Sequence, residues 1–351
     1  MATEPVGHGG QAHVVKLTQV DPHDQTAFAR WFDVLDGWQR EQRPGEPGWL
    51  LEEQRAFALA GDGADPDERV VLLQAEQDGV VHGIARAELP RRDNLHLLHG
   101  LVVVGEPHRR QGTGRLLLAE LERTAVQAGR RAVIVEADEP PGAEGRSAAR
   151  HLAELLGYVA EQEEVRRDID LPLAPQVVQD LGRVAREHAA DYVVRSWVGA
   201  APDELAEELA GLFRVMSRDV PTAGLAYAEE DWDVARLRRD EAEAVQMGRT
   251  VVGAGAVHLP TGRMTAFTRT AVPGALPARA YQWDTLVVDE HRGHRLGTLV
   301  KLVCLQRLAE QSPATQWIST WNAAENTPMI RVNDALGART NGRLVAFQKR
   351  L

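Results

Sequence analysis

Hydrophobic and polar residues follow one another along this chain in patterns that predict a mixed α/β protein. Two-residue alternation and short apolar runs predict strands, whereas apolar residues at every third or fourth position predict helices. In the first half, the patterns predict strands at 13–19, 70–75, 80–89, 95–104 and 132–136 and helices at 24–40, 49–60, 115–128 and 146–156. In the second half, they predict strands at 191–198, 250–259, 263–271 and 281–288 and helices at 202–218 and 231–246. Each half is expected to end with a helix, a strand, a helix and a final strand.

The two halves contain the same motifs in the same order. An apolar segment at 101–104 precedes Arg-Arg-Gln-Gly-Thr-Gly at 109–114, and a similar segment at 286–288 precedes Arg-Gly-His-Arg-Leu-Gly at 292–297. The leading arginines of the two motifs are 183 residues apart, and the downstream glycines Gly157 and Gly337 are 180 residues apart. Because two landmarks share nearly one offset, close to half the chain, the pattern indicates a duplication.

The repeat divides the chain into an N-terminal unit at 1–171, a helical linker at 172–190 and a C-terminal unit at 191–351. The linker contains an amphipathic pattern at 175–188, which predicts a helix that is stiffer than a Gly/Ser tether. We therefore expect the units to keep a fixed relative placement and to share a sheet edge or a hydrophobic seam, as in a covalent dimer.

Length, composition and charge agree with two ordered domains and exclude several classes of protein. The chain has 351 residues and is 44% hydrophobic, and its formal charge of −11 disfavours nucleic acid as a partner. No apolar run is long enough to cross a membrane, and the polar N-terminus lacks the pattern of a secretion signal, so we expect a cytoplasmic protein. The acidity could attract a cationic amine, or it could simply keep the protein in solution.

The chain has a single cysteine, Cys304, which excludes an intrachain disulfide and a Cys-based metal site. Its place in the apolar run 299–308 predicts a buried thiol on a helix, and we expect no metal. Aspartates in 61–68 resemble a calcium loop only superficially, because the terminal glutamate is not at the required spacing. The sequence leaves the choice between a monomer and a homodimer open.

The motif at 109–114 connects a predicted strand directly to a predicted helix. The first amides of a helix lack intrahelical partners and carry a partial positive charge, and glycines let such amides surround an anion. Arg109 and Arg110 add positive charge beside them. The string Gly-x-x-x-x-Gly-Lys-Ser/Thr of nucleotide triphosphatases is absent, and a dinucleotide fold would place its glycines after the first strand rather than the fourth. The motif therefore predicts a phosphate cradle of another class.

This Arg-x-x-Gly-x-Gly motif after the fourth strand, with Leu156-Gly157-Tyr158 downstream, resembles the GNAT superfamily of N-acetyltransferases. The resemblance covers nearly the whole chain as two copies and is similar in organisation to mycothiol synthase-like tandem acetyltransferases. It implies an α/β fold with a mixed sheet, built as two tandem GNAT-type domains, and it implies acetyl-CoA (CoA) as the cofactor. The cofactor-binding residues implied in the first unit are Val102, Val103, Val104, Arg109, Arg110, Gln111, Gly112, Thr113, Gly114 and Arg115. Those implied in the second unit are Leu286, Val287, Val288, Arg292, Gly293, His294, Arg295, Leu296, Gly297, Thr298 and Asn326.

The two copies of the cradle differ at one glycine. The first copy matches the family pattern at Arg109, Gly112 and Gly114, whereas Arg295 replaces the first glycine in the second copy. A side chain fits at this position if the backbone angles are helical, and its guanidinium could then reach a phosphate; the alternative is a decayed site. The sequence therefore favours CoA binding by the first loop and leaves binding by the second loop open.

The resemblance also implies an asparagine after the fifth strand, followed seven residues later by a tyrosine that protonates the departing thiolate. The second unit has Asn326 and then Asn333, and the first unit has Arg146 and Ala153 at the equivalent positions. The expected phenol is therefore missing from both units. Protonation of the thiolate falls to water, to another side chain or to no particular group.

Candidate acid–base residues come from the predicted fourth and fifth strands. Asp284 could anchor a substrate ammonium or relay its proton, or it could be a solvent-facing carboxylate. In the first unit the candidates are His99, with His96 near it, and Glu136, although a structural histidine is the simpler alternative. In the family, a backbone N–H of the fourth strand polarises the thioester carbonyl.

These patterns lead to two hypotheses of different class. The first is an N-acetyltransferase that transfers an acetyl or other short acyl group from CoA to a primary amine of a small molecule or peptide. Direct attack in a ternary complex is expected, because the sequence offers no Ser-His-Asp or Cys-His set for a covalent intermediate. The second, motivated by the missing tyrosines, is a catalytically degenerate sensor or scaffold that binds acyl-CoA without turnover.

Overall fold

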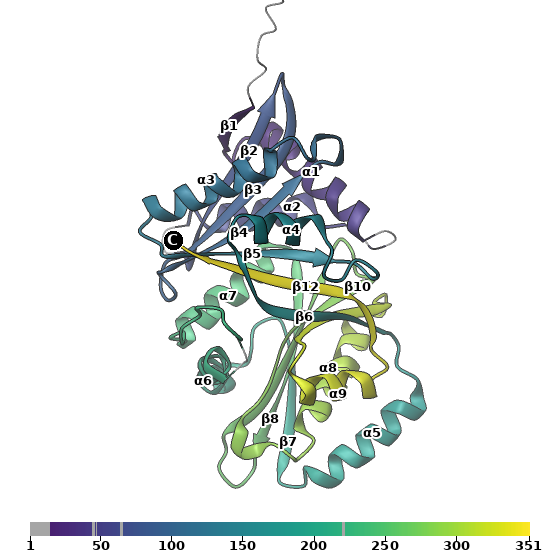
Figure 1. The fold of residues 1–351 in the computed structure, drawn as a ribbon. Coiled ribbons are helices and arrows are strands. Elements are labelled where there is room, and N and C mark those ends of the chain that lie inside the picture. The colour runs from purple at the N-terminus through teal and green to yellow at the C-terminus, as the bar shows by residue number, and fades with distance from the viewer. Residues whose placement is uncertain (1–14, 44–45, 47, 64–65, 220–221) are drawn as a thin grey trace, which may run out of the picture.

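The computed structural model of the chain describes residues 15–43, 46, 48–63, 66–219 and 222–351 (Figure 1). The first two residues of the strand predicted at 13–19 lie outside the described residues. The elements of the first half are β1 (Lys16–Val20), α1 (Gln25–Gln42), α2 (Leu51–Ala60), β2 (Glu68–Gln77), β3 (Val80–Pro90), β4 (Leu97–Val104), η1 (Glu106–His108), α3 (Thr113–Gln127), β5 (Ala132–Glu139), α4 (Ala148–Leu155) and β6 (Val159–Asp170).

The linker and the second half repeat this order of elements. They contain α5 (Pro175–His188), β7 (Tyr192–Val198), α6 (Asp203–Asp219), α7 (Val234–Gln246), β8 (Arg249–His258), β9 (Met264–Pro273), β10 (Arg279–Val287), η2 (Asp289–His291), α8 (Leu296–Gln311), β11 (Trp317–Ala323), α9 (Thr327–Ala335) and β12 (Arg339–Arg350). The predicted mixed α/β fold is confirmed. The linker helix has the predicted bounds, whereas β4 begins two residues later than predicted, so that His96 lies in the turn before it.

The twelve strands found in the described residues form one continuous sheet, in the order β1-β2-β3-β4-β5-β12-β6-β11-β10-β9-β8-β7. The prediction that the two halves share a sheet edge is therefore confirmed. Most neighbouring strands are antiparallel, and the parallel pairs β4–β5 and β10–β11 occupy equivalent places in the two halves. The sheet is mixed, as the resemblance implied.

The two halves exchange their final strands at the middle of this sheet. The last strand of the chain, β12, pairs with β5 of the first half from Arg343↔Glu139 to Arg350↔Ala132. In return, β6 of the first half pairs with β11 of the second half from Trp317↔Asp170 to Ala323↔Glu164. Figure 1 shows β12, in yellow, lying between β5 and β6. Because each half completes the sheet of the other, the two units form one structural body, and the division at 171 and 191 remains a prediction.

Helices cover both faces of the sheet. In the first half, α3 packs over one face through Leu117 and Leu121, and α1 packs over the other through Phe28 and Trp31. The second half is built in the same way, with α8 and the linker helix α5 on one face and α6 and α7 on the other (Figure 1). Apolar side chains at helical spacing thus form a separate core on each face.

Residues 222–233, between α6 and α7, cross from the second half onto the first, and we call them the crossing segment. The Ala226 amide donates to Gln348 Oε1 at 2.7 Å, and the Ala228 amide donates to Asn94 Oδ1 at 2.7 Å. The Ala226 carbonyl oxygen lies 2.6 Å from His96 Nε2. This crossing segment closes the space between the two halves, where the cavities described below are found.

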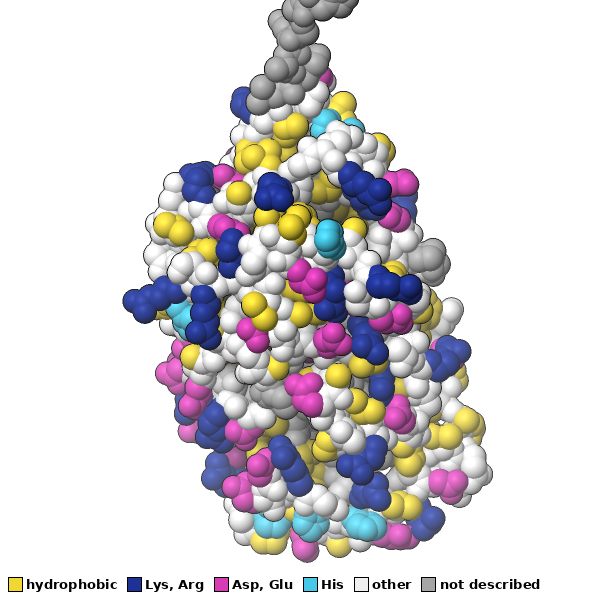
Figure 2. Space-filling view, in the orientation of Figure 1, with side chains coloured by type: hydrophobic (Ala, Val, Ile, Leu, Met, Phe, Trp, Pro, Cys, Tyr) yellow, Lys and Arg dark blue, Asp and Glu magenta, His cyan; other side chains and the backbone are white. Residues whose placement is uncertain are grey.

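Charged side chains are mixed on the surface that Figure 2 presents. Acidic and basic groups alternate over this face, and neither sign forms a continuous field there (Figure 2). No helix among the described residues is long and apolar enough to span a membrane.

Candidate functional site

The first predicted cradle, residues 109–114, forms the turn that leads from β4 and η1 into α3. Gly112 is the N-cap residue of α3, with a φ of 89° in the left-handed region. No described side chain caps the first amides of α3, so these N–H groups keep their hydrogen-bonding capacity for a ligand. The turn has the left-handed glycine and the uncapped helix start that suit an anion, and binding of an anion by it stays a prediction.

Two neighbours restrict the first cradle. Arg109 does not extend over the helix end, because it forms a bidentate ion pair with Glu41 of α1 and donates to the Val104 carbonyl at 3.0 Å. On the other side, α4 packs closely over Gly114, where a Cβ atom would lie 2.8 Å from Leu152 Cδ2. The space beside this loop is therefore occupied by protein side chains.

The second predicted cradle, residues 292–297, makes the same turn at the start of α8. Arg295 is the N-cap residue, with φ 57° and ψ 19°, so its backbone is left-handed rather than helical. The left-handed conformation costs an arginine about 1 kcal/mol or more that a glycine would not incur. No described side chain caps the first amides of α8, and Arg295 is exposed at their edge. The two loops are thus equivalent in backbone geometry despite the missing glycine.

The second cradle is more open than the first. A Cβ atom on Gly297 would find its nearest described neighbours at 3.7 Å, in Val287, and at 3.9 Å, in Val332. Val332 stands where Leu152 stands in the first half, and it is shorter by one carbon. This difference gives a Cβ atom at position 297 more room than one at position 114, although Leu296, Gly297 and Thr298 are buried and Gly114 is only partly buried.

Each cradle stands beside a pair of parallel strands that separate. β4 and β5 pair only from Leu97↔Ala132 to Gly100↔Val135, and β10 and β11 pair only from Arg279↔Trp317 to Tyr281↔Ser319. Beyond these positions, each pair diverges toward the cradle end of the strands. A gap in a sheet exposes backbone groups and side chains from both strands to a ligand that enters it.

A β-bulge distinguishes the second gap from the first. The register between β10 and β9 shifts between Gln282 and Asp284, so Trp283 has no partner residue on β9. In the first half, β4 pairs with β3 in continuous register from Val104↔Gly83 to His99↔Glu88. A bulge leaves the amide of its extra residue outside the ladder and re-aims it. Only β10 of these two strands therefore offers such an amide at the gap.

A cavity of about 500 Å³ occupies the second gap. Its walls come from β10 and β11, from α8 and α9, and from α6 and the crossing segment. Among its lining residues are Gln282, Trp283, Asp284, Lys301, Asn322, Asn326, Phe213, Trp232 and Tyr227. Polar and aromatic side chains thus share this wall, which suits a polar ligand with an apolar body.

Lys301 of α8 lines this cavity and takes part in a chain of hydrogen bonds. Its Nζ donates to Asn333 Oδ1 at 2.9 Å and to Gln282 Oε1 at 3.3 Å. Asn333 Nδ2 then donates to Asn322 Oδ1 at 2.6 Å. Burial lowers the pKa of Lys301 to about 8. Asn333, which stands where the resemblance implied a tyrosine, is therefore the hydrogen-bond partner of a buried lysine.

Asp284 of β10 also lines this cavity, and it is not the solvent-facing carboxylate that the sequence left as an alternative. Its Oδ2 accepts from Arg269 Nε at 2.7 Å, and Arg269 also donates to Asp240 Oδ2 at 2.6 Å. Burial raises the pKa of Asp284, although Arg269 acts in the opposite direction. The carboxylate is therefore half-buried, ion-paired and next to the gap.

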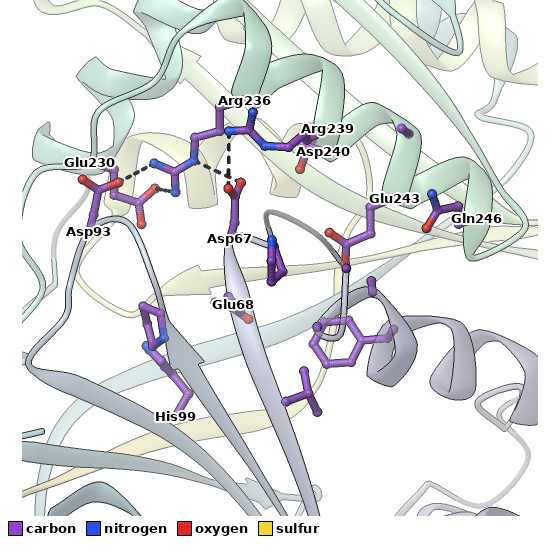
Figure 3. Close-up of a pocket in the computed structure, with 18 of the residues that line it drawn as sticks. Asp67, Glu68, Asp93, His99, Glu230, Arg236, Arg239, Asp240, Glu243 and Gln246 are labelled. Atoms are coloured by element: carbon purple, nitrogen blue, oxygen red, sulfur yellow. Dashed lines mark hydrogen bonds and ion pairs between the residues drawn. The ribbon is translucent and has the colours of Figure 1, made fainter. Parts of the chain in front are cut away.

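A second cavity, of about 760 Å³, lies between the two halves (Figure 3). Its upper wall in Figure 3 carries Arg236, which forms ion pairs with Asp93, Glu230 and Asp67. His99 lines the opposite side, and its ring stacks on Tyr227 with 5.4 Å between centroids. Since Tyr227 and Glu230 line both cavities, the two spaces are neighbours.

The three predicted acid–base residues are not brought together. Asp284 lines the smaller cavity and His99 the larger one, and burial lowers the pKa of His99. Glu136 lies on β5 and keeps contact with solvent, but desolvation and repulsion from Glu164 and Glu88 raise its pKa to about 7. Asp284 alone of the three lines the cavity in the second gap.

Sequence reasoning did not identify Lys301. The signal was present, because a lysine inside the apolar run 299–308 must either be buried or lie on a narrow polar face. The equivalent residue in the first half, 183 positions earlier, is Leu118, which is buried in the core. Cys304, in contrast, is the buried helix thiol that the sequence predicted. Among the described residues, no group of three or more His, Cys, Asp and Glu side chains is arranged to hold a metal ion.

Comparisons with known proteins agree with this architecture. Residues 29–158 match the model of the Acetyltransferase (GNAT) family. A solved structure described as a tandem GNAT protein from the clavulanic acid biosynthesis pathway is 25% identical, with 96% of this chain and 98% of that chain covered and a TM-score of 0.76. A GCN5-related N-acetyltransferase from Sphaerobacter thermophilus shares the fold at 17% identity, with coverages of 96% and 95% and a TM-score of 0.67. No curated protein matches the chain.

The fold, the two strand gaps and the two helix-end loops agree with a tandem GNAT organisation. Residues 29–158 match the GNAT family model, and the whole chain is similar to a solved tandem GNAT protein. The yeast N-myristoyltransferase of Saccharomyces cerevisiae has the same fold at 11% identity, with a TM-score of 0.57 over 96% of this chain and 80% of that chain. Acetyl transfer from acetyl-CoA is the general chemistry of the family.

Proposed function

We propose that the second unit is an N-acetyltransferase, which transfers an acetyl or short acyl group from CoA to a primary amine by direct attack in a ternary complex. The observation that carries this proposal is the polar cavity in the gap between β10 and β11, beside a helix start whose first amides have no described side-chain cap. The bulge at Trp283 adds a backbone amide at the same gap. In the first unit, the corresponding strand has no such bulge in its pairing with β3.

The residues of the second cradle fit a diphosphate. The amides that follow Arg295 have no described cap, and Gly297 leaves room beside them. In this proposal the segments 286–288 and 292–298 hold the diphosphate and the start of the pantetheine arm, and Asn326 contacts the arm from the start of α9. Acetyl-CoA, when bound, supplies the activated thioester. The Trp283 amide would polarise its carbonyl, as an oxyanion-hole donor does.

Asp284 is the proposed anchor for the acceptor amine. Its carboxylate lies in the cavity wall one residue from the bulge, and Arg269 keeps it in a fixed orientation. A carboxylate there can accept a hydrogen bond from the ammonium form of the acceptor and take up the proton that the amine must lose.

The first-unit residues 102–104 and 109–115 form the second proposed CoA cradle, which we expect to bind more weakly because Leu152 and the Arg109–Glu41 pair restrict it. His99 and Glu136 remain proposed acid–base residues for that unit.

The alternative is a sensor that binds acyl-CoA without turnover, and the absence of a tyrosine at position 333 favours it. The test is incubation of the full chain with acetyl-CoA and a panel of primary amines while free thiol is followed. Amine-dependent thiol release is the expected result. Tight CoA binding with no thiol release above the rate of hydrolysis, for every amine, would favour the sensor.

A further inference from the structure

Lys301 is buried in the apolar face of α8. It retains 2% of its surface exposure, and the residues around it on the same helix face are Gly297, Val300, Cys304 and Leu308. No carboxylate among the described residues lies within ion-pair distance of its Nζ. A buried ammonium without an ion-pair partner destabilises a fold. A methionine of similar length would fill the same space without that cost. The position therefore calls for an explanation other than stability.

The hydrogen bonds around Lys301 fix the orientation of its partners. An ammonium can only donate, so Asn333 presents its Oδ1 to Lys301 and its Nδ2 to Asn322. Two of the three N–H bonds of Lys301 have acceptors, in Asn333 and Gln282, and the described residues provide no third acceptor. Lys301 also lines the cavity in the gap. One N–H group thus remains for a ligand in this cavity.

Lys301 is the one ionisable group in this hydrogen-bonded chain. Neither the asparagines nor Gln282 can give up a proton near neutral pH. The charged and titratable groups that face it from the same helix and across the cavity are Cys304 on α8, Arg269 on β9, Asp284 on β10, Asp240 on α7, Glu164 on β6, and Glu230 and Tyr227 in the crossing segment. None of the acidic groups forms a hydrogen bond with its Nζ.

We propose that Lys301 donates the proton to the departing CoA thiolate, in place of the tyrosine that the family uses, with Asn333 and Gln282 as positioning residues. This inference rests on the proposed function of the second unit. As the N–C bond to the acceptor forms and the C–S bond breaks, the thiolate takes a proton from Lys301 Nζ and leaves as the thiol. The amine loses one proton to Asp284 and from there to solvent, and the neutral Lys301 regains one from solvent, so protons and charge balance.

The electrostatics of the site suit this role. Burial brings the pKa of Lys301 to about 8, which is close to the ordinary pKa of an alkyl thiol at about 8.5. Proton transfer between groups of similar pKa has little thermodynamic cost in either direction. Leu118 at the equivalent position of the first unit cannot supply a proton, so the inference also assigns turnover to the second unit.

The test is the thiol pKa of bound CoA, which requires no knowledge of the acceptor. CoA and desulfo-CoA are titrated calorimetrically into the wild-type chain and the Lys301→Met variant across pH, in buffers of different ionisation enthalpy. The nearby ammonium should lower the thiol pKa by about one unit in the wild type, a tenfold change in its ionisation constant. CoA binding then releases protons near pH 8 and desulfo-CoA binding does not. In Lys301→Met the difference should vanish, whereas Lys16→Met, the same change at an exposed lysine, should match the wild type.

Each outcome decides a different claim. An ordinary thiol pKa in the wild-type complex, or an equal one in both proteins, would overturn the role of Lys301 and leave the proposed function standing. No CoA binding to the wild type would overturn both. With any amine that is turned over, Lys301→Met should lower kcat by about 100-fold with little change in the KM for acetyl-CoA. An unchanged kcat would also contradict the inference.

Discussion

At the scale of the residue, this protein keeps polar groups where its fold would be more stable without them. Lys301 lies in the core-facing surface of α8, and Arg295 has a left-handed backbone that suits a glycine or asparagine better. Buried charges and unfavourable backbone angles persist at functional sites when the surrounding structure holds them. Both residues belong to the second unit and lie beside the same gap, which is why we assign the chemistry to that unit.

Replacement of Lys301 by methionine should stabilise the folded chain. Lowering the pKa of Lys301 from 10.5 to about 8 corresponds to about 3 kcal/mol of unfavourable free energy at neutral pH. The variant leaves Asn333 Oδ1 without its donor, which costs about 1 to 2 kcal/mol. We therefore expect a net gain of about 1 to 2 kcal/mol near pH 7, measured by denaturant unfolding. A variant less stable than the wild type would indicate that Lys301 is a structural residue.

The sign of the pH dependence follows from the same pKa. Between pH 8 and 10.5 the unfolded chain holds more protons at Lys301 than the folded chain, so this residue makes wild-type stability rise with pH. Lys301→Met lacks that contribution. Its advantage should thus be largest below about pH 8 and disappear above about pH 10.5. An advantage that is independent of pH would contradict burial of the charged form.

At the scale of the element, a single extra residue in β10 separates the two units. The bulge at Trp283 interrupts the ladder with β9, whereas β4 pairs with β3 without interruption. Deletion of Trp283 would restore a continuous register, with Gln282 opposite Thr270 and Asp284 opposite Arg269. We expect the deletion to leave CoA binding largely intact and to lower kcat by about 100-fold, because one carbonyl-polarising amide is lost.

The matched control for this deletion is Trp283→Ala. It removes the indole, which lies over Arg269 and Arg249, but keeps the extra residue in the strand. A loss of kcat in the deletion that Trp283→Ala does not share would assign the effect to the backbone. Equal activity of the deletion variant and the wild type, in the thiol-release assay, would contradict the role of the bulge.

The sequence predicted most elements because their apolar spacing is regular, but it could not predict how closely the later helices pack against the two loops. Gly112 and Gly114 match the family pattern better than Arg295 and Gly297, yet a Cβ atom on Gly114 would clash with Leu152, whereas the shorter Val332 leaves room for one on Gly297. That difference depends on how closely α4 and α9 approach the cradles. A bulge and a buried lysine likewise depend on register and packing, which one sequence does not specify.

At the scale of the whole molecule, the exchange of β6 and β12 makes the two units interdependent. β5 has β12 as a partner, and β11 has β6, so a half expressed alone would expose unpaired strand edges. We expect the fragments 1–190 and 191–351 to lack a cooperative thermal transition when expressed separately and to regain one when co-expressed. A fragment that unfolds alone with the Tm of the full chain would contradict this interdependence.

The strand exchange also explains why the sequence revealed the duplication but not the way in which the two copies assemble. Repeated motifs identify two copies of one unit, but both an exchanged and an unexchanged arrangement satisfy the same apolar pattern at 159–170 and 339–350. The crossing segment adds contacts such as Ala228 with Asn94 that no local pattern predicts. The cavities between the halves therefore follow from assembly rather than from either unit.

The central claim is that the start of α8 binds the diphosphate of CoA, and one pair of variants tests it most directly. Arg295→Asn and Arg295→Asp both suit the left-handed N-cap position and differ only in charge, so a difference in CoA affinity reports on the bound phosphate. Gly112→Asn and Gly112→Asp form the same pair in the first cradle. Calorimetric titration with CoA should show Arg295→Asp binding at least about tenfold more weakly than Arg295→Asn, with a smaller difference for the Gly112 pair. Equal affinity within the Arg295 pair would contradict the claim, and a loss confined to the Gly112 pair would move the site to the first unit.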